Sequence, residues 1–131
     1  MTYWNALMRA QMILVACFFL FPIAAGAAEP FAEIETLING GQYEQALQKL
    51  DALLQQNPDN AEAQAQKGMV LGALADQAEN MIEMARYGLA AMEAFETALK
   101  LDPDNITARL GRGTFSLMAP PPFGNVDAAL A

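Results

Sequence analysis

Apolar residues recur with helical spacing along most of the chain after residue 28. Within residues 44–55 they fall every three or four positions, which places them on one face of a helix. Pro58 cannot continue that helix, and Asp59 or Asn60 can cap the next one. Residues 61–74 are again typical of a helix. The pattern predicts an all-α chain, with no convincing strand.

The chain also repeats itself at an interval of 45 residues. The sequence Pro-Asp-Asn at residues 58–60 recurs at residues 103–105, and Gly68 corresponds to Gly113. Further corresponding pairs are Ala46 with Ala91, Leu50 with Phe95, Leu54 with Leu99, and Ala63 with Ala108. Such an ordered set indicates a repeated unit of helix, turn, helix and proline, and therefore an array of antiparallel helix hairpins.

These residues resemble the tetratricopeptide repeat, a family of stacked helix hairpins. The matching positions are Gly41, Tyr43, Ala46, Leu47, Leu50, Leu53 and Pro58 in one unit, Ala91, Phe95, Ala98 and Pro103 in the next, and Gly124, Ala129 and Leu130 in another. Together the units cover residues 29–131, which we expect to form one helical repeat domain. The resemblance implies an α-solenoid of about two and a half repeats.

The middle unit is expected to be an elongated hairpin. Its two prolines are 45 residues apart, whereas the family's repeat is about 34 residues long, and the surplus corresponds to about three helical turns. Asp76 and Glu79 have the spacing of a capping box, so we expect a second helix to begin near there and to run to about Leu101. The apolar stripe expected on that helix is Ala78, Ile82, Ala85, Leu89, Met92, Phe95 and Leu99.

Residues 1–28 are predicted to be a secretory signal peptide. Arg9 makes the start basic, residues 12–28 carry no charge, and Ala25 and Ala27 have the spacing of a cleavage site. The chain is therefore expected to be exported, most simply to a periplasm. Two alternatives stay open: residues 12–28 are retained as an inner-membrane anchor, although they are short for a spanning helix, or Cys17 belongs to a lipobox like that of bacterial lipoproteins.

Composition argues against catalysis and metal binding. The chain has no His and one Cys, so the commonest general base and metal ligand is missing. Ser116, the only serine, has neither group to activate it. Met81, Met84 and Met92 are interpreted as flexible core residues and not as soft-metal ligands. We therefore expect no enzymatic activity, no cofactor and no metal ion.

Charge restricts the class of partner. All fifteen acidic residues and six of the seven basic residues follow residue 28, which gives that part of the chain a net charge of −9. Such a surface repels phosphate backbones and anionic lipid. We expect a protein or peptide partner and no nucleic acid, with membrane contact only if residues 12–28 are retained.

The resemblance also implies where a partner binds. In this family the first helices of successive repeats form a concave face that holds a peptide or a partner helix. Carried over to this chain, the positions on that face are Phe31, Glu35, Ile38, Ala65, Met69, Gly72, Leu110, Thr114 and Leu117. The expected function is a non-catalytic protein–protein interaction scaffold; the alternative is a membrane-anchored assembly factor.

The C-terminal residues depart from the repeat pattern. Residues 119–125 contain three consecutive prolines, which favour extended backbone where the family has a tight turn, and Phe123 follows them. Some of the concave-face residues are alternatively expected to pack against this segment or against a following helix. The sequence stops at Ala131, where a helix is beginning. We expect it to be a fragment of a longer protein; the alternative is that a partner chain completes the last helix.

The signal-peptide prediction can be tested by mass spectrometry of the chain after export. We expect the mature N-terminus at Ala28 or Glu29, because small residues stand at the cleavage spacing just before it. A mass that includes Met1 contradicts cleavage and favours the membrane anchor.

Overall fold

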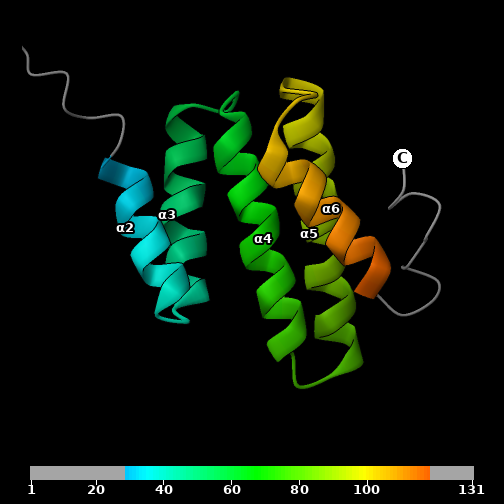
Figure 1. Ribbon diagram of the computed structural model, residues 1–131. Helices are drawn as coiled ribbons and strands as arrows, with labels where there is room; N and C mark the ends of the chain where they lie inside the picture. The colour runs from blue at the N-terminus through cyan, green and yellow to red at the C-terminus, as the bar shows by residue number, and fades with distance from the viewer. Residues whose placement is uncertain (1–28, 119–131) are drawn as a thin grey trace, which may run out of the picture.

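The computed structural model describes residues 29–118, and the secondary structure of this part is entirely helical. The helices are α2 (Glu29–Asn39), α3 (Tyr43–Gln56), α4 (Ala61–Gln77), α5 (Met81–Leu101) and α6 (Ile106–Met118). Each runs antiparallel to the one before it, with α2 and α6 at opposite sides of the array (Figure 1). The all-α prediction is confirmed. The predicted signal peptide, the Pro-rich segment and the last repeat lie outside the described residues.

The repeated Pro-Asp-Asn sequences make the same turn twice. α3 and α5 each end two residues before the proline, which cannot continue a helix. The Asn60 Oδ1 atom then accepts a hydrogen bond from the Ala63 backbone N–H at 3.0 Å, and the Asn105 Oδ1 atom accepts one from the Ala108 N–H at 2.8 Å. Both asparagines satisfy a backbone donor in the first turn of the following helix. The turn and its cap were predictable from the sequence.

The break between α4 and α5 lies later than the capping-box spacing predicts. α4 continues through Asp76 to Gln77, and α5 begins at Met81. The cap is Asn80, whose Oδ1 atom accepts a hydrogen bond from the Glu83 backbone N–H at 2.9 Å. The extra residues of the middle unit lie in these two helices, which are 17 and 21 residues long, against 14 in α3.

The buried face of α5 also differs from the predicted stripe. Ile82 and Leu89 were expected in the core, but their exposed fractions are 82% and 57%. The buried residues of α5 are Gly88, Ala91, Ala94, Phe95 and Ala98. Four of these five are Gly or Ala, whose small side chains let neighbouring helices approach closely. Phe95 of the predicted stripe is buried and Leu99 packs against the same cluster, so the prediction holds in part, whereas Ile82 and Leu89 lie outside.

α4 contributes to two hydrophobic clusters, one on each side of it. The cluster with α2 and α3 contains Ile34, Ala46, Leu50, Leu54, Ala63, Val70 and Leu74. The cluster with α5 and α6 contains Ala65, Leu71, Ala91, Ala94, Phe95, Ala98 and Ala108. Because α4 buries more than one face, its apolar residues surround the helix instead of forming one stripe. α4 is thus the central helix of the described fold.

A single aromatic ring sets the contact between α4 and α6. Phe95, from α5, is 2% exposed. A Cβ atom placed on Gly68 of α4 would lie 2.6 Å from the ring, and one placed on Gly111 of α6 would overlap it as well. The ring therefore fills the space that side chains at both glycines would need. Both glycines are therefore close-packing sites.

Two glycine substitutions in α4 should change stability in opposite directions. Gly68→Ala forces a methyl group against the buried ring of Phe95, and we expect the free energy of unfolding to fall by about 1–3 kcal/mol. A Cβ atom on Gly72 meets no atom within 4 Å, so Gly72→Ala should raise it by about 0.5–1 kcal/mol through helix propensity. Urea denaturation of both variants measures the difference, and equal effects would contradict the packing described here.

Candidate functional site

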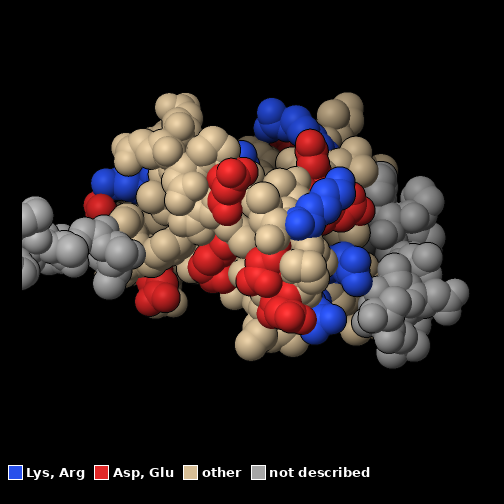
Figure 2. All heavy atoms as spheres, turned by 90° about the horizontal axis from the view of Figure 1, so that it is seen from above, with Lys and Arg blue, Asp and Glu red and all other residues tan. Residues whose placement is uncertain are grey.

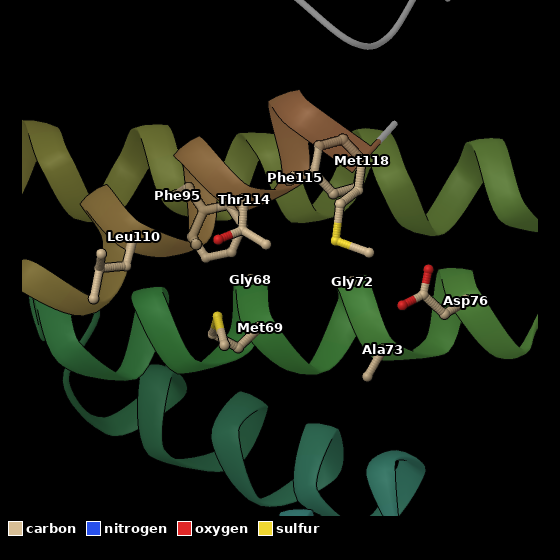
Figure 3. A pocket seen from close by; sticks show the side chains of 11 residues that line it. Gly68, Met69, Gly72, Ala73, Asp76, Phe95, Leu110, Thr114, Phe115 and Met118 are labelled. Atoms are coloured by element: carbon tan, nitrogen blue, oxygen red, sulfur yellow. The ribbon is translucent and has the colours of Figure 1, made fainter. Parts of the chain in front are cut away.

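A hollow lies between α4 and α6, and Phe95 of α5 is part of its lining (Figure 3). It has a volume of about 280 Å³. Its lining comes from the second half of α4, from Phe95 of α5 and from most of α6. These residues are Gly68, Met69, Gly72, Ala73, Asp76, Phe95, Leu110, Gly111, Thr114, Phe115 and Met118. Apart from Asp76 and Thr114, every lining side chain is apolar or absent, so the hollow suits an apolar ligand group.

The floor of the hollow is formed where α4 has no side chain. Phe95 closes one part of it between Gly68 and Gly111. One turn further along α4, Gly72 borders open space, because no other atom would lie within 4 Å of a Cβ atom there. A side chain from another molecule therefore has access to the backbone of α4 at Gly72.

The rim of the hollow carries large apolar side chains that are exposed to solvent. Met69 on α4 is 50% exposed, and Leu110 on α6 is 67% exposed. Met118, at the end of α6, is also exposed and lines the hollow (Figure 3). Covering such groups would remove apolar surface from water at about 25 cal/mol per Å². The rim is thus a surface where association with another apolar surface is favourable.

A polar network holds the start of α6 against the start of α4. The Asn105 Nδ2 atom donates to Glu62 Oε2 at 2.9 Å, and the Thr107 Oγ1 atom donates to Glu62 Oε1 at 3.1 Å. Asn105 is buried and also caps α6, so its side chain makes bonds to two different helices. Hydrogen bonds to a charged group are stronger than neutral ones. This network fixes the end of α6 that is remote from Asp76.

The structure brings together some of the residues predicted for a concave face. Met69, Gly72, Leu110 and Thr114 line the same hollow. Leu117 is exposed on α6 but is not among the lining residues.

The other predicted residues lie elsewhere. Ala65 is completely buried in the cluster shared by α4, α5 and α6, so its side chain is not accessible to a partner. Phe31 and Ile38 pack against the cluster of α2 and α3, and Glu35 is exposed on α2. α2 lies on the opposite side of the array from α6 (Figure 1), so these three residues are remote from the hollow.

Several lining residues did not follow from the sequence. Asp76 matched a helix cap but remains in the last turns of α4, with its carboxylate at one end of the hollow (Figure 3). Phe115 and Met118 are on α6, one and four positions beyond the predicted Thr114. Residues four apart lie on one helix face, so the spacing of Met118 from Thr114 and of Phe115 from Gly111 was the signal available.

The lining offers few reactive groups. Its polar side chains are the carboxylate of Asp76 and the hydroxyl of Thr114, and they belong to different helices. Ser116 is buried outside the lining. Within residues 29–118, no three acidic side chains converge as metal ligands. Of the three methionines considered as soft-metal ligands, Met81 is exposed at the start of α5, and Met84 and Met92 are half-buried.

None of the helices in the described part of the chain combines the length and the apolar character needed to cross a membrane. Residues 12–28, on which the anchor alternative depends, lie outside that part.

Comparison with known proteins identifies one family. Residues 20–110 match the family described as alkyl sulfatase dimerisation. The match takes in α2, α3, α4 and α5 completely and α6 up to Leu110. No curated protein and no solved structure matches the chain. Since the matched region spans well over half of the 131 residues, the chain belongs to the alkyl sulfatase dimerisation family.

Proposed function

We propose that this chain is a non-catalytic interaction module and that the hollow between α4 and α6 binds an apolar segment of another protein. The observation that carries the proposal is the hollow itself, with its apolar lining and the exposed Met69, Leu110 and Met118 at its rim. An amphipathic helix that docks into a groove between helices buries such side chains at a regular spacing. Binding would thus depend on shape and apolar area.

A tetratricopeptide-like arrangement of the helices is part of the proposal and would explain this choice of surface. We propose that α2 with α3 and α4 with α5 are successive hairpins of a solenoid, and that α6 is the first helix of the next hairpin. In that arrangement α4 and α6 are the first helices of neighbouring units, which form the concave face of such arrays. The packing of α4 against both α5 and α6, and the equivalent Asn60 and Asn105 caps, agree with it.

The distribution of charge supports a protein partner. On the face formed by one set of helix ends, acidic side chains gather toward the middle and basic ones lie mostly toward the edge (Figure 2). With a net charge of −8 for the whole chain, phosphate backbones are repelled.

We further propose that the module acts after export. The alternative is that residues 12–28 are retained as a membrane anchor.

Blocking the hollow tests the proposal. The probe is a synthetic amphipathic helix of about 18 residues with Leu at helical spacing among Ala and Gln. Gly72→Leu places a side chain in the open space of the hollow, so we expect at least tenfold weaker binding and no loss of stability. Ala52→Leu, which adds the same side chain at an exposed position of α3, is the control and should bind like the unmodified chain.

Fluorescence anisotropy measures the affinity, and NMR chemical shifts locate the bound peptide. We expect shifts at Met69, Gly72 and Leu110, and none at Phe31. If the peptide does not bind, or binds equally well after Gly72→Leu, the hollow is not the binding site.

Self-association is a second candidate function, favoured by the description of the family as a dimerisation module. The outer face of α5 supplies a surface for it. Ile82 and Leu89 are exposed and seven residues apart, so they lie on one side of the helix. α5 lies completely within the matched region, whereas α6 does so only in part. A symmetric dimer would bring the two copies of this face together.

Light scattering coupled to size exclusion tests self-association. If the α5 face joins two copies, Ile82→Lys should convert a dimer to a monomer at micromolar concentration, because it replaces an apolar contact of the interface with a charge. Ala52→Lys on α3 is the matched control and should leave the mass unchanged. A monomeric unmodified chain, or an Ile82→Lys variant that stays dimeric, contradicts this role of α5.

A further inference from the structure

The two ends of the hollow differ in electrostatic character. At one end lie Met69 and Leu110, which are apolar. At the other end lies the carboxylate of Asp76, seven residues further along α4 (Figure 3). At a rise of 1.5 Å per residue, the two positions on α4 are about 10 Å apart along the helix axis. A ligand lying along α4 would therefore meet apolar groups first and a negative charge after about two turns.

The end of α4 adds to the negative potential of Asp76. The last carbonyl groups of a helix have no partner within it and carry the negative end of the helix dipole. α4 has no basic residue in its last turn to offset this. Within residues 29–118, the carboxylate of Asp76 has no ion-pair partner. Among the described residues no basic side chain pairs with Asp76, although the last turn of a helix favours a positive charge.

Asp76 stands where a carboxylate does not stabilise its own helix. Acidic side chains are favourable in the first turn of a helix and unfavourable in the last, because of the dipole. Residues that are locally unfavourable for folding are expected at functional sites. The side chain is exposed and makes no hydrogen bond that would explain it within the described residues.

We infer that the occupant of the hollow is an amphipathic helix with a basic side chain about two turns from its apolar anchor, and that Asp76 receives the basic group. The inference rests on the proposed function and adds the charge and the orientation of the partner. The apolar anchor covers Met69 and Leu110, and the lysine or arginine reaches Asp76 and the end of α4. Because only one end of the hollow is negative, the helix binds in one direction.

The test compares two peptides that differ at one charged residue. Both have the Leu, Ala and Gln sequence of the probe above, with either Lys or Glu seven positions from the central Leu. We expect the Lys peptide to bind about three- to tenfold more tightly, with a difference that shrinks at high salt. Asp76→Asn should abolish most of this preference, and Asp76→Lys should reverse it.

A measurement of stability separates this role from a structural one. Removing the carboxylate from the last turn of α4 should raise the Tm of Asp76→Asn by about 1–5 °C while it weakens binding of the Lys peptide. Glu44→Gln is the matched control, because it removes the same charge from the first turn of α3, away from the hollow. Its Tm should not rise, and it should keep the preference for the Lys peptide.

Each other outcome overturns the inference in a distinguishable way. Equal affinity for the Lys and Glu peptides contradicts the role of Asp76 and leaves the hollow as a binding site. A loss of affinity for both peptides in Asp76→Asn would assign this residue a structural role. If neither peptide binds, the proposed function fails together with the inference. If the unmodified chain is a dimer that Gly72→Leu dissociates, the occupant is a second copy of the chain.

Discussion

The position of α6 against α4 depends on one ring. Phe95 occupies the space beside Gly68 and Gly111. Because neither glycine has a side chain, the backbones of α4 and α6 can both lie directly against the ring. The same use of glycine has a different effect one turn later, at Gly72, where nothing fills the space. One stretch of α4 therefore provides both a close contact with the ring of Phe95 and the opening next to it. The hollow begins where the ring of Phe95 no longer fills the space beside α4, so no special loop is needed to form it.

Much of the fold was predictable because its signals are local. The proline and the asparagine of each Pro-Asp-Asn sequence determine where one helix ends and the next begins. The break after α4 was misplaced because two acidic residues with capping-box spacing competed with Asn80, which made the better cap. The face of α5 was misjudged because the predicted stripe followed the larger apolar residues and ignored the position of charge. Ile82 and Leu89 lie on the side of α5 that also carries Arg86, whereas the buried side consists of small residues and Phe95.

The site was predictable only in part. Equivalent positions in a repeat identify the helix face on which a residue lies, and this was enough to bring Met69, Leu110 and Thr114 to one hollow. Equivalent positions in the repeat do not show which helices are neighbours in the fold. Phe31 has a comparable position on α2, but its side chain packs against the first cluster, far from α6. Asp76 could not be assigned either, because its importance comes from the end of α4 and from the opening beside it, and neither exists before folding.

The shared use of α4 has a consequence for how the molecule unfolds. Both clusters contain side chains of α4, with Val70 in one and Leu71 in the other. If α5 and α6 detached, they would leave one side of α4 in water, and loss of α2 and α3 would expose the other. Neither half keeps its full set of contacts alone, although stacked hairpins can in principle melt one after another from their ends. The two halves are thus thermodynamically coupled through a single element, and heat should disrupt them in one cooperative transition.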